Sequence, residues 1–164
     1  MANRICKIVC AVDVDTERFA QKIVYNLLIN SLFLDFNDMT NQAVIPAKTL
    51  LIGASTNPER YSFKAAHSLH KHGHEIVLLG LKAGQVAGQS ILTERPVLSD
   101  IDTVTLYIGP QHQTDWYDYV LNLKPRRVIF NPGTENAEFE ALLLKNNIEA
   151  SEACTLVLLS IRAY

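Results

Sequence analysis

Cysteine is scarce in this sequence, and its scarcity excludes a small fold held together by disulfides. The three cysteines, Cys6, Cys10 and Cys154, are odd in number and widely spaced. Such usage is typical of proteins that fold in a reducing compartment, so we expect a cytoplasmic protein. Cys6 and Cys10 by themselves are also too few to hold a zinc ion.

A surplus of positive charge and a long apolar run are also lacking. The 15 Lys and Arg residues and the 17 Asp and Glu residues give a net charge of −2, which provides no electrostatic basis for binding nucleic acid. No apolar run approaches the roughly 20 residues that a membrane helix needs. The apolar segment 8–12 is short and runs into Asp13 and Asp15, so we expect neither a membrane partner nor a secretory signal.

What the sequence has instead is a regular alternation of apolar strands and helices over residues 46–164. We expect strands over 48–53, 74–80, 103–108, 126–130 and 147–150, and helices over 62–72, 111–123, 135–146 and 153–161. This alternation predicts one α/β domain with three layers, in which helices cover both faces of a parallel sheet. Gly73 is expected to end the helix over 62–72. The segment 81–96 is expected to be a loop.

Residues 1–45 fit this pattern less well, and we treat them as an N-terminal extension whose status stays open. The segment 4–15 could form a strand, and 16–36 could form a helix with Thr16 as its N-cap. Two interpretations compete. The segment is either a genuine extension that packs on the domain or on a neighbouring subunit, or a translated upstream region with the natural start at Met39.

Small and polar residues follow each of the main predicted strands. The junctions are Gly53-Ala54-Ser55, Leu81-Lys82, Gly109-Pro110 and Asn131-Pro132-Gly133. In open parallel sheets, ligands bind beyond the carboxyl ends of the strands, near the point where the strand order reverses. The four junctions therefore predict one shared binding site.

The first junction determines which kinds of ligand are plausible. The dinucleotide fingerprint G-x-G-x-x-G keeps only its first glycine, Gly53. A nucleophilic Ser55 would need the motif G-x-S-x-G, and the second glycine is absent. An NAD site usually has an acidic residue after the second strand, which binds the ribose hydroxyls. This chain has Lys82 there. A cation there suits a ribose phosphate, which both NADP and coenzyme A carry.

The same junction can also form a phosphate cradle. Gly53, Ala54 and Ser55 leave backbone N–H groups accessible, and Asn57-Pro58 favours an extended loop. The following helix begins near Ser62, so its N-terminus can face an anion. Ser62 could equally serve as a simple N-cap.

The segment LIGASTNPERYSFKAAHSLHKHGHEIVLLG (51–80) resembles the opening of the small CoA-binding-domain proteins, which have a Rossmann-like fold. It is similar to the CoA-binding domain of the succinyl-CoA synthetase α subunit. YIGP (107–110), IFNPGTEN (129–136) and SEACTLV (151–157) resemble later segments of that family. The "NP" that usually follows the second strand is absent, which puts the details of adenine recognition in doubt.

The resemblance implies a coenzyme A site at these positions. Gly53 to Ser55 and Ser62 would lie near the pyrophosphate, Lys82 near the 3′-phosphate or adenine, and the later junctions along the cleft. The implied binding residues are Gly53, Ala54, Ser55, Asn57, Pro58, Arg60, Ser62, Lys82, Gly109, Pro110, Asn131, Pro132 and Gly133.

Other groups of reactive residues are better explained by packing or solvation. His67, His70, His72 and His74 gather near one helix end without acidic or cysteine partners that would complete a metal site. Exposed helix faces account for most carboxylates, although Glu135 follows a strand end and could face the cleft. Cys154 opens the last helix and could meet a ligand thiol.

The function that we expect is non-catalytic binding of coenzyme A or an acyl-CoA, because no catalytic constellation is complete. Two alternatives stay open: an NADP-dependent oxidoreductase, and a subunit that lends its CoA site to a ligase partner. A homodimer is possible, with Trp116, Tyr117 and Tyr119 as residues that pack on the domain or on a second subunit.

Overall fold

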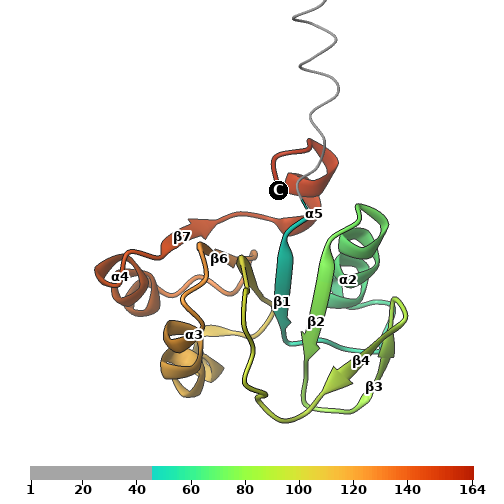
Figure 1. Cartoon of the computed structure of the whole chain (residues 1–164), viewed down its shortest axis with the longest axis horizontal. Coiled ribbons are helices and arrows are strands. Elements are labelled where there is room, and N and C mark those ends of the chain that lie inside the picture. Colours follow the sequence, from blue (N-terminus) through green and yellow to red (C-terminus); the bar gives the residue numbers. More distant parts are fainter. Residues whose placement is uncertain (1–45) are drawn as a thin grey trace, which may run out of the picture. The chain divides into compact units, whose positions relative to one another are not determined.

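A seven-stranded sheet forms the centre of the computed structural model, which describes residues 46–164 (Figure 1). Its strand order is β3-β4-β2-β1-β5-β6-β7. The strands are β1 (Lys48–Ile52), β2 (Glu75–Leu79), β3 (Gly84–Val86), β4 (Gln89–Leu92), β5 (Thr103–Leu106), β6 (Arg127–Phe130) and β7 (Glu149–Glu152). The helices are α2 (Tyr61–Lys71), α3 (Tyr117–Leu123), α4 (Ala137–Lys145) and α5 (Thr155–Ser160).

Two apolar cores lie on opposite faces of the sheet. On one face, Ala65 and Leu69 of α2 and Leu159 of α5 pack on a cluster that contains Leu51 and Leu78. On the other face, α3 and α4 cover a larger cluster through the buried side chains Tyr117, Val120, Phe139 and Leu143. Adjacent residues of β1, such as Leu50 and Leu51, belong to different clusters because strand side chains alternate between faces. The predicted three-layer, Rossmann-like α/β domain is therefore confirmed.

The prediction of a loop over 81–96 is wrong. This segment contains the β3–β4 hairpin, the antiparallel pair at one edge of the sheet, whereas β4 itself pairs parallel with β2. Ala87 and Gly88 form the turn, and both have positive φ angles, 52° and 77°. Two positive φ angles are typical of the tight turns that match the twist of a hairpin. The strands are short and polar, so their apolar periodicity gives no signal.

The helix predicted over 111–123 is regular only in its second half. Two 3₁₀ turns, Pro110–His112 and Thr114–Trp116, precede α3. Gln113 lies between these turns and is fully buried. Its side chain bonds to the backbone of two other segments, which explains why the chain bends inward here. The other predicted helices agree with the structure to within about two residues at each end.

The predictions for the N-terminal extension, including Thr16, Met39, Cys6 and Cys10, lie outside the described residues. Within 46–164, no helix is long and apolar enough to cross a membrane.

The strand order reverses between β1 and β5. From β1 the chain passes to β2 on one side, and β5 then pairs with the other side of β1. β6 and β7 continue in that second direction. The carboxyl ends of β1 and β5 thus flank the topological switch point, where open α/β sheets bind their ligands.

Candidate functional site

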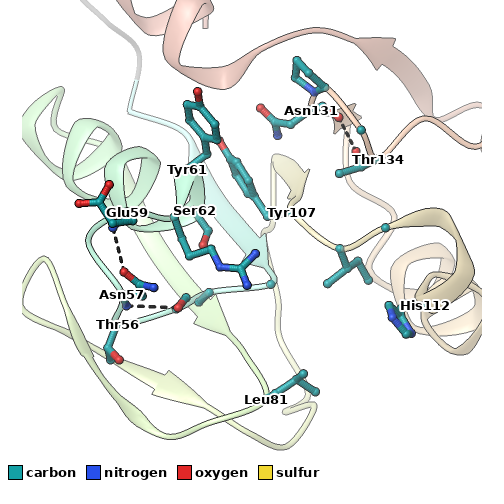
Figure 2. Close-up of a pocket in the computed structure, with 18 of the residues that line it drawn as sticks. Thr56, Asn57, Glu59, Tyr61, Ser62, Leu81, Tyr107, His112, Asn131 and Thr134 are labelled. Carbon is teal, nitrogen blue, oxygen red and sulfur yellow. Dashed lines mark hydrogen bonds between the residues drawn. The ribbon is translucent and has the colours of Figure 1, made fainter.

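A cleft of about 1060 Å³ opens at this switch point (Figure 2). Its volume matches the upper range of small-molecule and cofactor pockets, on the order of 1,000 Å³. Two sets of residues line it. The β1–β2 half comprises lining residues 53–57, 59–62, 81 and 82, and the β5–β6 half comprises 107–109, 112, 131–134, 154 and 156.

The structure brings nearly all of the predicted binding residues together in this cleft. Those that line it are Gly53, Ala54, Ser55, Asn57, Arg60, Ser62, Lys82, Gly109, Asn131, Pro132 and Gly133. Pro58 and Pro110 do not line it; each adjoins a lining residue instead. That these residues contact coenzyme A stays a prediction.

Gly53 connects β1 to the cleft in a conformation that suits only glycine. Its φ angle is +98°, and a Cβ atom there would lie 2.8 Å from the backbone carbonyl carbon of Tyr107. The N–H groups of Gly53 and Ala54 both donate to the Leu79 carbonyl, at 2.9 and 2.8 Å. The first turn is therefore held tightly between β2 and β5, which explains why its single glycine is needed. The expectation that the Gly53 and Ala54 N–H groups are accessible to a phosphate is wrong, because both already donate to Leu79.

Short-range hydrogen bonds shape the loop from Ser55 to Arg60. The Asn57 N–H donates to the Ser55 hydroxyl at 3.2 Å, and the Asn57 side-chain oxygen accepts from the Glu59 N–H at 2.9 Å (Figure 2). These bonds are local side-chain turns of the kind that asparagine and serine favour. Ser55 is thus part of a turn, and within residues 46–164 no hydrogen bond joins its hydroxyl to a histidine that could activate it.

The N-terminus of α2 faces the cleft without a side-chain cap. The helix begins at Tyr61, its N-cap is Arg60, and no side chain accepts a hydrogen bond there. Ser62 is the second residue of the helix and is buried, so the interpretation of Ser62 as the N-cap is wrong. The first turn also carries no acidic residue. Uncapped N–H groups and the helix dipole favour an anion at this position.

Arg60 and Lys82 provide the cationic side chains of the β1–β2 half, and Glu59 is the acidic side chain there. All three are exposed. Long, exposed cations can move toward phosphate oxygens at low cost, because they hold no other ion pair within the described residues.

Tyr107 follows β5 and brings a buried hydroxyl group to the cleft. Burial raises the pKa of Tyr107 far above its ordinary value, and the nearby Cys154 adds to this effect. The hydroxyl has no hydrogen-bond partner in residues 46–164. Thr105 and Thr155 lie near it, but their hydroxyls bond each other at 2.8 Å. The Tyr107 hydroxyl is therefore neutral, and it lies buried beside Thr105 and Thr155 while other atoms of Tyr107 line the cleft.

Asn131 is 3% exposed and all of its side-chain atoms are engaged within the protein. Its amide nitrogen donates to the Thr105 hydroxyl at 2.7 Å and to the Leu106 carbonyl at 3.1 Å. Its amide oxygen accepts from the N–H of Thr155, the first residue of α5, at 2.9 Å. Asn131 thus connects β5, β6 and α5, and it positions Cys154 at the cleft.

A second amide group stabilises the opposite wall of the β5–β6 half. The Gln113 nitrogen donates to the carbonyls of Ile108 and Thr134, at 3.0 and 2.6 Å. Its oxygen accepts from Asn136, whose own side-chain oxygen caps α4. Sequence reasoning missed Gln113, since no local pattern reveals bonds across 21 residues.

Sequence reasoning also missed several lining residues, namely Glu59, Tyr61, Tyr107, Ile108, His112, Thr134 and Leu156. Most adjoin a predicted residue, so a wider window around each strand end would have included them. Leu156 and Cys154 come from the start of α5, which the strand-end rule does not cover.

Three of the four clustered histidines make contacts of their own. His67 packs on the Phe63 ring, His72 bonds to the Ser68 carbonyl, and the buried His74 accepts from the Ala47 N–H. In the part of the chain that the structure describes, no three His, Cys, Asp or Glu side chains are grouped to hold a metal ion.

The fold and the position of the cleft define a Rossmann-like α/β domain with a ligand-sized cleft at its topological switch point. A family model described as "CoA binding domain" matches residues 47–160, and the chain belongs to that family.

Solved structures resemble the chain over the same region. A crystal structure of a protein described as uncharacterized is 52% identical, with a TM-score of 0.71, and the match covers 73% of this chain and 98% of that one. A protein from Thermus thermophilus is 18% identical, with a TM-score of 0.67 and coverage of 78% and 98%. A hypothetical protein from Pyrococcus horikoshii OT3 is 20% identical, with a TM-score of 0.66 and coverage of 77% and 90%. The last two show the fold alone. A search of curated proteins finds no match.

Proposed function

We propose that this protein is a non-catalytic module that binds coenzyme A or an acyl-CoA in the cleft at the switch point. The observation that carries the proposal is the β1–β2 half, where an uncapped helix N-terminus meets two exposed cations, Arg60 and Lys82. Family membership makes coenzyme A the first ligand to test. A cytoplasmic homodimer belongs to the same proposal.

The pyrophosphate would bind over the turn from Gly53 to Ser55, against the first N–H groups of α2. Lys82 follows β2, where Rossmann-like domains recognise the ribose. Its ammonium group would pair with the 3′-phosphate of coenzyme A. Arg60 would neutralise the pyrophosphate from the other side.

The pantetheine arm would then extend toward the β5–β6 half. Ile108, Tyr107 and Leu156 give this half apolar surface against which the arm can pack. The thiol or thioester would lie near Cys154 and Thr134.

Catalysis is not part of the proposal because the cleft residues do not pair as acid and base. Glu59, Arg60 and Lys82 are the charged lining residues, and no ion pair joins them. His112 is exposed on a 3₁₀ turn, and no carboxylate in the described part of the chain bonds to it. General acid–base chemistry needs such groups in mutual contact with a reacting atom.

The test is calorimetric titration of the purified chain with CoA, dephospho-CoA, NADP and NAD. We expect CoA to bind, dephospho-CoA to bind more weakly, and NAD to bind weakest. Binding of NADP without binding of CoA would contradict the proposal and would favour an oxidoreductase. Lack of binding by all four ligands would contradict it as well.

A further inference from the structure

The Glu135 carboxylate accepts hydrogen bonds from a backbone N–H group at the edge of the cleft. Its two oxygens accept from the Gly133 N–H, at 3.0 and 2.8 Å, and Gly133 lines the cleft. Main-chain hydrogen bonds, from its own N–H and from Gly133, hold the pKa of Glu135 below its ordinary value. The group is therefore a carboxylate at neutral pH.

Two more carboxylates belong to the same group: Glu140 in the first turn of α4, and Glu152, the last residue of β7. Repulsion from Glu140 is the main reason why the pKa of Glu152 is raised, and Glu135 contributes further. Glu140 also accepts, weakly, from the Asn136 N–H at 3.4 Å. These three carboxylates are not themselves lining residues, but they place negative charge next to Gly133 of the β5–β6 half.

The cations of the cleft lie at the other end. Arg60 and Lys82 belong to the β1–β2 half, and the described lining residues of the β5–β6 half include neither Lys nor Arg. An anionic group that entered the β5–β6 half would find no Lys or Arg partner there. It would also find the Gly133 N–H already engaged by Glu135.

We infer that the cleft selects CoA thioesters whose acyl group is uncharged, and that Glu135 rejects acyl groups with a terminal carboxylate. The inference rests on the proposed function, because phosphates bound at Arg60 and Lys82 direct the thioester toward the β5–β6 half. A carboxylate that approached the lining residue Gly133 would be repelled by the Glu135 carboxylate bonded to it. Rejection of like charge is a common way to gain specificity without adding contacts to the preferred ligand.

Butyryl-CoA and succinyl-CoA provide a matched pair of probes, since a methyl group in one replaces the carboxylate in the other. We expect wild-type protein to bind butyryl-CoA about as well as CoA and succinyl-CoA roughly threefold to tenfold more weakly, with a difference that shrinks at high salt. Calorimetric titration with all three ligands gives the ratios.

Two variants test whether Glu135 causes the preference for butyryl-CoA over succinyl-CoA. Glu135→Ala removes the charge and frees the Gly133 N–H, so the preference for butyryl-CoA should shrink or reverse. Glu138→Ala is the control: this exposed residue in the first turn of α4 removes the same charge without a bond to Gly133. The preference should persist in Glu138→Ala.

Each outcome decides the inference. Equal or tighter binding of succinyl-CoA by the wild type would overturn it while leaving the proposed function intact. An equal change in both variants would show that only net charge matters, and would overturn the role of Glu135. Failure of CoA itself to bind would overturn the proposed function, and this inference with it.

Discussion

The β1–β2 half of the cleft differs from the β5–β6 half in what its side chains bond to. In the β1–β2 half, the side chains of Arg60 and Lys82 are exposed and unpaired within residues 46–164, and the backbone N–H groups face outward from a helix end. In the β5–β6 half, the side chains of Asn131 and Gln113 are buried and bond to backbone and side-chain groups of neighbouring segments.

The two halves therefore differ in what they contribute: one provides affinity for a charged ligand, and the other provides a stable cleft. Exposed cations contribute to affinity for a charged ligand, but they add little to the stability of the free protein. Buried amide networks fix the shape of the cleft, and each unsatisfied group that they leave after mutation is costly. Substitutions in the first half should therefore lower affinity, whereas substitutions in the second half should lower stability first.

Asn131→Ala should have the largest effect on stability. It leaves the buried Thr155 N–H and Leu106 carbonyl without their partner, and we expect a loss of roughly 2–4 kcal/mol in the free energy of unfolding. Asn57→Ala is the control from the other half, because Asn57 is exposed and makes one local side-chain bond. It should cost about 1 kcal/mol or less. Urea denaturation measures both, and equal losses would remove the distinction between the halves.

Gly53→Ala should cause the second largest loss in the free energy of unfolding. The positive φ angle and the 2.8 Å approach to the Tyr107 backbone both oppose a Cβ atom, so we expect a loss of about 2–3 kcal/mol. Gly133→Ala separates these causes: its φ is +86°, but nothing lies within 4 Å of the added Cβ. That variant should lose only about 1 kcal/mol. Thermal unfolding compares them, and a Gly133→Ala loss as large as that of Gly53→Ala would show that close packing is unimportant.

Arg60→Ala should weaken CoA binding without unfolding the domain. Its side chain caps nothing, so the melting temperature should stay within about 2 °C, while affinity falls roughly fivefold to tenfold. Lys71→Ala removes a cation from the opposite end of α2 and should leave affinity unchanged. A large fall in melting temperature for Arg60→Ala would contradict the assignment of stability to the β5–β6 half.

The smallest predicted effect lies at the amino end of the sheet, away from both halves. Burial is the main cause that lowers the pKa of His74 below 6.5, and His72 and Arg127 lower it further. The unfolded state then binds a proton before the folded state does. Stability should therefore fall as pH drops below 6.5 toward the folded pKa. His74→Phe should flatten this slope and keep the ring contact with Tyr164, without changing the affinity for CoA.

Sequence patterns predicted the β1–β2 half better than the β5–β6 half. The motif from Gly53 to Ser62 is contiguous, so strand-end rules and family resemblance locate it together. Lys82 follows from the same rules, because ribose recognition occurs at a fixed place in the fold. The capping role of Ser62 was wrong, since Arg60 is the N-cap and has no side-chain bond. The accessible N–H groups expected at Gly53 and Ala54 were wrong as well, since both donate to Leu79.

The β5–β6 half depends on contacts between distant segments. Asn131 was expected to line the cleft, but its three bonds to β5 and α5 could not be read from local sequence. Gln113 gave no signal because its partners lie in other segments. The β3–β4 hairpin was missed for a different reason: its turn places a non-glycine residue, Ala87, at positive φ.

The most direct test of the central claim is a thermodynamic cycle between Lys82 and the 3′-phosphate of coenzyme A. Calorimetry would give the affinities of wild type and Lys82→Ala for CoA and for dephospho-CoA, with Lys145→Ala as a control cation outside the cleft. The account predicts that Lys82→Ala weakens CoA binding roughly tenfold and leaves dephospho-CoA binding nearly unchanged. Equal weakening for both ligands, or none for either, would contradict the placement of the phosphates in the β1–β2 half.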